Sequence, residues 1–363
     1  MKMFSPKVFL FAFALALAFL RPPAARARGE KFEVQRVAEG VYAVVRREPL
    51  GLWFEANNVL IVNDEDVVVV DSNISPAATR EVIGALRKIT AKPVRYVVNT
   101  HWHEDHVIGN QAWREAYPAV EFVGHASTLR DFPAVGLANR KQAVEGGASL
   151  AAMFRKQIAE GRSLADGAAL AEEERAGYAQ TADLIERYVA ESPAFRVVLP
   201  TLTVEDRLTL VRGARTIEIR HLGRGHTGAD LVVYLPKESI VVAGDLVVWP
   251  VPLVGTTSHP AEFAAALEKL IALKPAVIIP GHGPVMRDDS HPRLVARLLN
   301  SIREQTEAAV KRGETLEQAR KSVNLDEFRK ALAGDSQLRA FVFHNYVTLP
   351  AVAAAYRQAA EKR

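Results

Sequence analysis

The chain has 363 residues, of which 49% are hydrophobic and 24% are charged, and it contains no cysteine. A chain of this length and apolar content can bury one large core, and the lack of cysteine excludes disulfide bridges and thiolate metal ligands. The formal net charge is +4, and residues 1–27 alone carry four basic residues and no acid. The rest of the chain is therefore near neutral, and its charge predicts no basic face for nucleic acid.

The first 27 residues predict a secretory signal peptide. A short basic leader precedes an unbroken apolar run over residues 8–20, and Ala25 and Ala27 supply small residues for cleavage after Ala27. An uncleaved membrane anchor is the alternative, which the shortness of the apolar run disfavours. We therefore expect a periplasmic or secreted protein that has no membrane contact once the signal is removed.

The segment after this leader begins with strand patterns. Runs rich in Val and Ile, separated by turn residues, predict short strands at 32–37, 41–47, 57–63 and 66–71. Ser75 and Pro76 then predict a helix start, with Ser as the N-cap and Pro in the first turn, and the helix should end near Thr90. Another strand is expected over 94–99.

Residues 127–195 differ in character. They are rich in Ala, Glu and Arg, and their apolar residues recur at helical spacing, which predicts an insertion of two or three helices. Strand patterns return at 201–204, 207–211, 214–221, 230–235 and 239–244, and a helix over 260–272 precedes a strand over 276–279.

Beyond His291 the pattern is helical. Thr315 and Gln318 form a capping-box motif in this tail. Further along, His344 lies on an expected helix among Phe341, Phe343 and Tyr346, a set that predicts core packing.

Two blocks of strands followed by helices, 32–125 and 201–289, determine the expected architecture. Packing their sheets face to face, with helices outside, buries the apolar faces of both. We therefore predict an α/β (α+β) fold, an αββα sandwich of two mixed β-sheets, over a domain at 28–290. The insertion at about 127–195 and a helical extension at 291–363, packed on the domain, could wall a pocket or mediate oligomerisation.

The run from His101 to His106 carries the strongest chemical signal. Its HxHxDH spacing places three imidazoles and a carboxylate, ligands of Zn²⁺ and similar ions, within six residues. Other polar residues fall at or between the ends of expected strands, where rigid sheets hold loops in place: Asp71, His226, Asp245 and His282. Each alone is more often a turn residue, but together and in this order they predict a metal site.

These motifs resemble those of the metallo-β-lactamase-fold hydrolase superfamily. The resemblance covers roughly residues 32–125 and 201–287, and it rests on THWHEDH (100–106), GRGHTGAD (223–230), GD (244–245) and PGHG (280–283). It implies that one ion is held by His101, His103 and His226, and a second by Asp105, His106 and His282. It also implies that Asp245 bridges the ions and that Asp71 orients a ligand histidine.

The resemblance implies chemistry as well. Two divalent ions, Zn²⁺ first and Fe or Mn as alternatives, would generate a bound hydroxide at neutral pH that attacks an ester, lactone, thioester or amide-like bond. Asp105 would carry a proton in this reaction. Trp53 and Phe54 could form a flap over the small-molecule substrate, and Arg224 could meet an anionic group on it. Ordinary packing and a solvated loop are the respective alternatives.

Three other functions use the same ligands. Asp245 lies where many β-lactamases of this fold have cysteine, which favours thioester and lactone hydrolases, yet export keeps a periplasmic β-lactamase as an alternative. A di-iron redox protein and a non-catalytic metal-binding accessory protein are the remaining alternatives.

Overall fold

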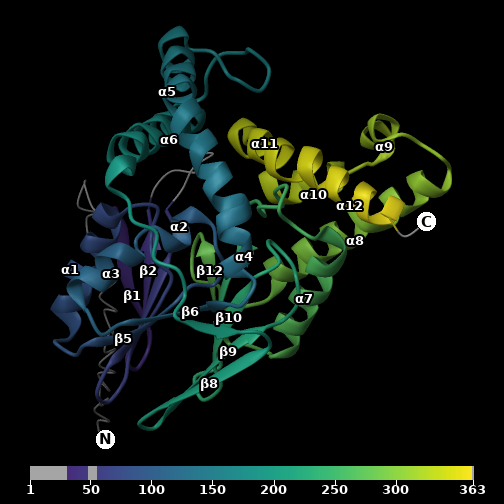
Figure 1. The fold of residues 1–363 in the computed structure, drawn as a ribbon. Coiled ribbons are helices and arrows are strands. Elements are labelled where there is room, and N and C mark those ends of the chain that lie inside the picture. The colour runs from purple at the N-terminus through teal and green to yellow at the C-terminus, as the bar shows by residue number, and fades with distance from the viewer. Residues whose placement is uncertain (1–30, 48–54, 362–363) are drawn as a thin grey trace, which may run out of the picture. The chain divides into compact units, whose positions relative to one another are not determined.

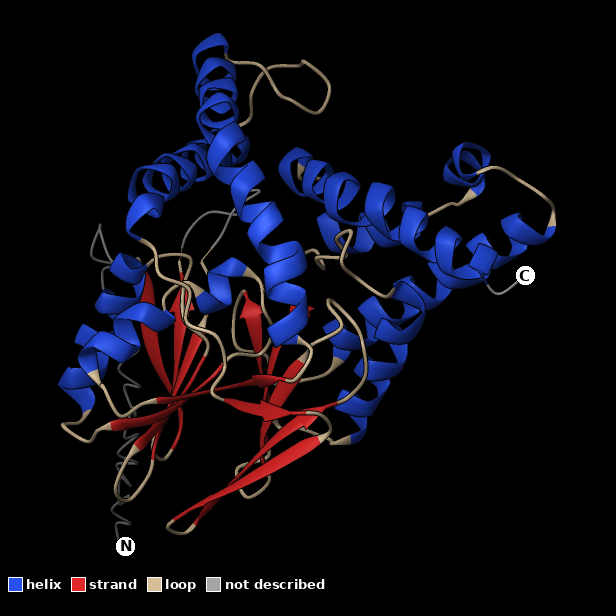
Figure 2. Cartoon of the chain, viewed as in Figure 1, coloured by secondary structure: helices blue, strands red, loops and turns tan. Residues whose placement is uncertain are grey.

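The computed structural model describes residues 31–47 and 55–361, and two β-sheets lie between helices (Figures 1 and 2). The expected signal peptide, Trp53 and Phe54 lie outside these residues. The first sheet has seven strands in the order β1 (Phe32–Ala38), β2 (Val41–Arg46), β3 (Asn58–Val62), β4 (Val67–Val70), β5 (Val94–Val98), β6 (Glu121–His125) and β7 (Leu202–Val204). The second has five, in the order β12 (Val277–His282), β11 (Ile240–Val248), β10 (Leu231–Leu235), β9 (Arg215–His221) and β8 (Arg207–Arg212).

Helices cover the outer face of each sheet, so the predicted αββα sandwich is confirmed. Helices α1 (Pro76–Ile89) and α3 (Asn110–Ala116) pack on the first sheet, and the short α2 (Glu104–Val107) lies between β5 and α3 in the chain. The second sheet packs on α7 (Pro260–Ala272) and α8 (Ser290–Lys311). None of the helices in the described ranges combines the length and apolarity that crossing a bilayer requires.

The valine run of strand β4 contributes side chains to two apolar clusters, one on each face of the first sheet. Val68 and Val70 pack in the cluster shared by the two sheets, whereas Val67 and Val69 pack with residues of α1 and α3. Successive side chains of a strand point to opposite faces, so a continuous valine run is buried on both sides.

Strands β7 and β11 differ most from expectation. Residues 201–204 were expected in the second block, but β7 pairs in parallel with β6 of the first sheet, with Leu202 opposite Val123. That expectation was wrong because strand propensity does not specify which neighbour a strand will pair with. Strand β11 runs four residues beyond the expected end at 244, since Leu246, Val247 and Val248 are all buried.

The insertion and the extension are helical, and they share one apolar cluster with the second sheet, in which Phe154 and Ile185 meet Val342 and Val347. The insertion comprises α4 (Thr128–Asp131), the π-helical turn η1 (Phe132–Gly136), α5 (Leu137–Glu160), α6 (Glu172–Glu191) and the short η2 (Ser192–Ala194). After α8, the extension comprises α9 (Leu316–Ser322), α10 (Asp326–Ala333), α11 (Gln337–Phe343), the π-helical turn η3 (His344–Thr348) and α12 (Leu349–Glu361).

Local details of the extension agree with the sequence in part. The capping box forms: Thr315 N–H donates to Gln318 Oε1 at 2.8 Å, and Gln318 N–H donates to Thr315 Oγ1 at 3.3 Å. The expectation that His344 is a core residue is wrong, because this side chain is exposed. Phe343 is fully buried, and the ring of Tyr346 is half-buried.

Candidate metal centre

The seven candidate ligands meet where strand ends and loops of both sheets converge. From the first sheet, the loop after β5 carries His101 and His103, and the short helix α2 carries Asp105 and His106. From the second sheet, the loop between β9 and β10 carries His226, β11 carries Asp245, and β12 ends at His282. Residues more than 100 positions apart in the sequence thus face one another.

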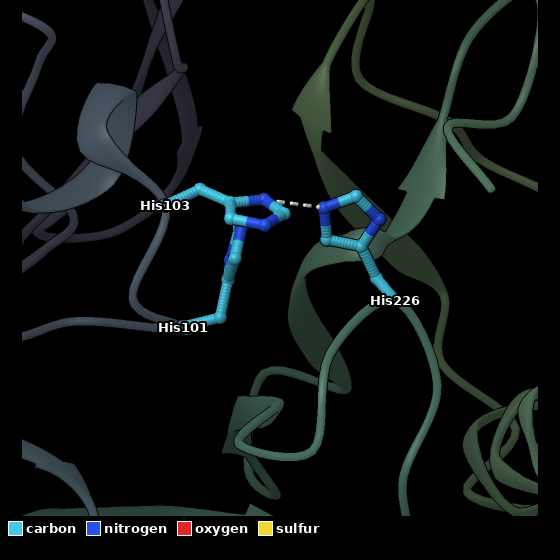
Figure 3. A group of neighbouring side chains, drawn as sticks. All are labelled: His101, His103 and His226. Carbon is cyan, nitrogen blue, oxygen red and sulfur yellow. Dashed lines mark hydrogen bonds between the residues drawn. The ribbon is translucent and has the colours of Figure 1, made fainter. Parts of the chain in front are cut away.

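One group consists of three imidazoles. A ring nitrogen of each of His101, His103 and His226 lies within 4.8 Å of the others. Figure 3 shows His103 and His226 pointing toward each other from opposite sides of the site, with His103 Nδ1 2.8 Å from His226 Nε2. Nitrogen atoms gathered in this way match the preference of Zn²⁺ for imidazole.

A second group joins a carboxylate to two imidazoles. Asp105 Oδ2 lies 3.3 Å from His106 Nε2 and 3.1 Å from His282 Nε2. Their ligand atoms also lie within 4.8 Å of one another. This group carries the negative charge that the first group lacks.

Asp245 lies between the two groups. Its Oδ2 is 3.5 Å from His226 Nε2 and 3.9 Å from His101 Nε2, while its Oδ1 is 3.3 Å from His106 Nε2 and 3.4 Å from His282 Nε2. One carboxylate oxygen therefore faces each group. Glycine at the neighbouring strand makes room for it, because a Cβ on Gly281 would stand 2.0 Å from Asp245 Oδ1.

The outer ring nitrogens of the histidines are held by oxygen atoms. Nδ1 of His226 donates to Leu253 O at 2.7 Å, and Nδ1 of His282 donates to Glu55 O at 3.1 Å. A carbonyl oxygen can only accept, so the proton of each neutral ring lies on Nδ1 and the lone pair of Nε2 faces the cluster. His101 and His103 have hydroxyls, those of Thr100 and Thr257, at 3.2 Å from their outer nitrogens.

Asp71 is placed directly behind His106. It follows β4 in the left-handed region with φ of 61°, and its Oδ2 accepts from His106 Nδ1 at 2.9 Å. The same carboxylate accepts from the Thr100 N–H at 2.7 Å and from its hydroxyl at 2.8 Å. Asp71 thus contacts the candidate ligand His106, as expected for the carboxylate that the family resemblance implied would orient a ligand histidine.

Burial and charge oppose each other in the cluster. Burial lowers the pKa of His106 and His282, but nearby carboxylates outweigh it, holding the pKa of His106 well above its usual value and raising that of His282 to about 10. Burial and neighbouring imidazoles instead lower the pKa of His101 well below its usual value, and that of His103 to about 3.

The donor set fits a pair of divalent ions. Five imidazoles and two carboxylates supply nitrogen and oxygen ligands suited to Zn, Fe or Mn. The buried Nε2 of His101 has no hydrogen-bond partner among the described residues, which is expected of an atom that serves as a metal ligand. Bound cations would also take the place of protons on the imidazoles that face carboxylates.

A cavity of about 350 Å³ opens onto the cluster. Its lining includes His103, Asp105, His226 and Asp245, together with Gly136, Asn139 and Ala143 of the insertion, Leu253 and residues 255–257, and Tyr346 of the extension. The insertion and the extension therefore wall the pocket, which is one of the two roles that the sequence left open.

The insertion also contacts the ligand-bearing helix α2. Glu104, between two candidate ligands, accepts a hydrogen bond from Tyr188 Oη at 2.6 Å, and Arg140 Nε lies 4.0 Å from its carboxylate. Burial raises the pKa of Glu104 to about 7. These contacts fix α2 against α5 and α6.

The structure does not bring Arg224 into this cavity. Its guanidinium forms an ion pair with Glu262, with Nε 2.7 Å from Oε2, and it lines a neighbouring cavity with Arg130 and Arg357. The role expected for Arg224 at a substrate anion is therefore not supported by its position.

Sequence reasoning assigned no role to Asp230, the last residue of GRGHTGAD. Its carboxylate accepts from Gly225 N–H at 3.0 Å and from the Thr227 hydroxyl at 2.7 Å, so it shapes the loop that presents His226. Burial raises the pKa of Asp230 to about 6. The sequence did contain a signal for this role, an Asp three residues after a Thr in a glycine-rich loop. Asp and Thr side chains in such loops commonly form hydrogen bonds with nearby backbone groups.

Comparisons with known proteins indicate one family. Residues 51–282 match the sequence profile of the metallo-beta-lactamase superfamily. A curated relative, the linear primary-alkylsulfatase of Pseudomonas sp. (strain ATCC 19151), is 27% identical over 233 residues, which are 62% of this chain and 40% of the relative. The chain thus spans less than half the length of that protein.

Two solved structures were compared with the chain, and the first of them shares the fold. The metallo-beta-lactamase FIM-1 from Pseudomonas aeruginosa, in its mono-zinc form, superposes with a TM-score of 0.51 and 18% identity, over 76% of this chain and 98% of that chain. A metallo-beta-lactamase from Pontibacter korlensis gives a TM-score of 0.49 and 19% identity, over 74% and 99% of the two chains.

Proposed function

This chain belongs to the metallo-beta-lactamase superfamily, whose members are hydrolases, and from that premise we propose that it is a two-metal hydrolase of a small molecule with an ester, lactone, thioester or amide-like bond. One observation carries the proposal: two buried ligand groups share Asp245, with one carboxylate oxygen toward each. A single-ion site would not need a carboxylate in that position.

The ligand assignment is part of this proposal. His101, His103 and His226 would hold one ion, and Asp105, His106 and His282 the other, with Asp245 between them. When bound, two divalent ions, Zn²⁺ first and Fe or Mn as alternatives, would activate water at neutral pH and polarise the bond to be broken.

The remaining steps fall to side chains of the chain itself. Asp105 lines the cavity while it contacts His106 and His282, so its carboxylate can accept a proton from the nucleophile and return it to the leaving group. Asp71 keeps the proton of His106 on Nδ1, and Leu253 O does the same for His226. Residues of the insertion and the extension form part of the cavity wall around these side chains.

Hydrolysis of a sulfate ester is a second candidate. It is favoured by the alkylsulfatase relative, in which the matched segment is 40% of the protein. The same two-metal geometry would serve both reactions, so only substrates distinguish them.

Elemental analysis and a substrate panel on one preparation test the proposal. We expect two divalent ions per chain and turnover of a phenyl ester, a lactone or a thioester. Turnover should be lost on chelation and restored by added Zn²⁺, because the proposed reaction requires both ions. The panel includes nitrocefin for β-lactam hydrolysis and dodecyl sulfate for the second candidate.

Other results would replace the proposal with a specific alternative. Bound metal with no hydrolysis across the panel would indicate an accessory protein. Bound iron with activity that requires an electron donor would indicate a redox protein. Full turnover by a preparation with less than one ion per chain would contradict the two-metal site. A chelated sample given Mg²⁺ instead of Zn²⁺ controls for nonspecific effects of the chelator.

We also propose that the protein is periplasmic or secreted. The proposal is supported by the leader pattern in residues 1–27. Expression of the full chain in a bacterium should yield a periplasmic or secreted product whose mass, measured by mass spectrometry, corresponds to a chain that begins at Arg28. A cytoplasmic product that retains Met1 would contradict export.

A further inference from the structure

A second cavity adjoins the cavity that opens onto the ligand cluster (the reaction cavity). It has a volume of about 590 Å³, against about 350 Å³ for the reaction cavity. Trp102, Thr256 and Thr257 line both cavities, and Thr257 Oγ1 lies 3.2 Å from the Nε2 atom of the candidate ligand His103. The two cavities therefore share these three residues as walls, next to the candidate metal site.

Arginines from distant parts of the chain line the second cavity. Arg130 belongs to the insertion, Arg224 to the loop that presents His226, and Arg357 to α12 of the extension. The segment that matches the family ends at residue 282, so the wall that α12 supplies lies outside the matched segment. Any ligand preference that comes from α12 is therefore a property of this chain's own extension.

Two of these arginines are neutralised by acids. Arg130 Nε lies 2.8 Å from Asp131 Oδ1, and Arg224 Nε lies 2.7 Å from Glu262 Oε2. Arg357 differs from both, because its side chain forms no ion pair, hydrogen bond or ring contact with any residue that the structure describes. Its positive charge is therefore available to a ligand.

The position of Arg357 allows such a contact. The residue lines the second cavity and is exposed, and an arginine carries its guanidinium on a long flexible stem, so the charge can reach a ligand there. Glu361, one turn further along α12, also lines the cavity but lies too far from Arg357 to form an ion pair with it. A guanidinium binds a carboxylate through two parallel hydrogen bonds, which makes a carboxylate the best-matched ligand group.

Trp102 supplies a second, independent observation. Its ring centroid lies 4.6 Å from that of His103, and only 4% of the residue is exposed. Its buried indole N–H has no acceptor among the residues in the described ranges. Buried donors are nearly always paired, and a ligand that passes Trp102 from one cavity to the other can supply an oxygen acceptor.

We propose that the substrate carries a carboxylate remote from the bond that is broken, and that Arg357 binds this carboxylate in the second cavity. The inference rests on the proposed hydrolase function and names the class of its substrate, an elongated acid such as the monoester or monothioester of a dicarboxylic acid. Arg357 contacts the remote group equally in the bound substrate and in the transition state, so it lowers KM rather than raising kcat.

The test compares Arg357→Gln with the wild type, as metal-loaded full chains, on two series of phenyl esters. Each ester is made from a dicarboxylic acid between succinic and suberic acid, with the second carboxyl group either free or converted to a primary amide, and phenol release measures turnover. The wild type should prefer the free acid. In Arg357→Gln the ratio of kcat/KM for the acid to kcat/KM for the amide should fall by about 10-fold, through KM, because a charge-assisted hydrogen bond is lost.

The extension offers a matched control in Arg320 of α9. This arginine is also exposed and without an ion pair in the described part of the chain, but it lines neither cavity, so Arg320→Gln should keep the wild-type ratio. Arg357→Lys should restore part of the preference, since it keeps the charge and loses the fork of donors. Glu361→Gln should raise the ratio, because it removes a negative charge near the bound carboxylate. Added salt should reduce the wild-type preference by screening.

Calorimetry measures the same contact without turnover. Each dicarboxylate from succinate to suberate is compared with the monocarboxylate of the same length, which lacks the remote group. Arg357→Gln should weaken the best dicarboxylate by a factor similar to the fall in the kinetic ratio, whereas the matched monocarboxylate should bind both proteins equally.

The outcomes separate this inference from the proposed function. Hydrolysis of these esters by the wild type with no preference for the acid at any length would overturn the inference and leave the proposed function standing. An unchanged ratio in Arg357→Gln, or an equal fall in Arg320→Gln, would do the same. If the wild type hydrolyses no ester, the proposed function fails, and the calorimetric comparison decides the carboxylate site: equal affinity of wild type and Arg357→Gln for every dicarboxylate would overturn it.

Discussion

Replacement of Asp245 by Ala should abolish hydrolysis. Its two oxygens face the two ligand groups, so the substitution removes the one side chain that both would share. Metal-derived stabilisation is worth several kcal/mol, and each ~1.4 kcal/mol is a factor of ten, so we expect kcat/KM to fall by about 10³-fold or more. Metal content, measured on the same sample, should fall from two ions per chain to one or fewer.

The control for this variant is Asp335→Ala, which removes an exposed carboxylate of the extension that lies outside the cavity lining. Its metal content and turnover should equal those of the wild type. Circular dichroism should show a folded Asp245→Ala protein, because the sheets pack through apolar clusters that do not include Asp245. Two retained ions with wild-type turnover in Asp245→Ala would refute the shared-carboxylate site.

The second large effect is expected for Asp71→Asn. In Asp71, Oδ2 accepts from His106 Nδ1 and from the Thr100 hydroxyl, while Oδ1 accepts from the Thr100 N–H, and an Asn amide has an oxygen for only one of these two positions. If NH₂ faces His106, the imidazole proton must move to Nε2, and the lone pair directed at the cluster is lost. Loss of such an orienting carboxylate lowers metal affinity by about 10–100-fold.

The backbone should tolerate this change, because Asn adopts the left-handed conformation that Asp71 has at φ of 61°. Titration with Zn²⁺ measures the expected loss of affinity, and excess Zn²⁺ should recover part of the turnover. Unchanged zinc affinity in Asp71→Asn would show that Asp71 does not determine the state of His106.

A buried carboxylate near the opposite end of β4 provides the matched control. Asp66 accepts from Asn63 Nδ2 at 3.0 Å and pairs with Arg212, away from the cluster. Asp66→Asn should lower the melting temperature while it leaves zinc affinity unchanged. The two variants together separate loss of stability from loss of metal binding.

Patterns within a few residues predicted most of the secondary structure. Ser75 caps α1, because its Oγ accepts a hydrogen bond from the Ala78 N–H, and the helix ends at Ile89, close to the expected end. The helix at 260–272 has its predicted ends. Capping and apolar periodicity act between residues that are close in sequence, so these features can be recognised without the fold.

The candidate ligands were also recognisable, for a related reason. Four of the seven lie within the six residues from His101 to His106, and the others stand in glycine-rich motifs at strand ends or loops. Ligand chemistry restricts both residue type and spacing, which makes the motif specific. The family resemblance supplied the pairing of distant members, and the structure brings those members within contact distance of one another.

Other features depended on the tertiary structure alone. The sequence around Tyr346 has the same apolar character as a core helix, and only the path of the extension brings this residue to the cavity wall as well as against the core. In the same way, Arg224 adjoins a ligand-bearing loop in sequence, yet its side chain pairs with Glu262 on α7.

The sequence by itself predicted most of the strands, the capped helices and the candidate metal-ligating side chains, since each depends on local periodicity or on ligand chemistry. The tertiary structure alone decided that β7 joins the first sheet and that the insertion and extension wall the pocket. These outcomes depend on which apolar faces pack together across long sequence separations, and composition does not encode that choice locally.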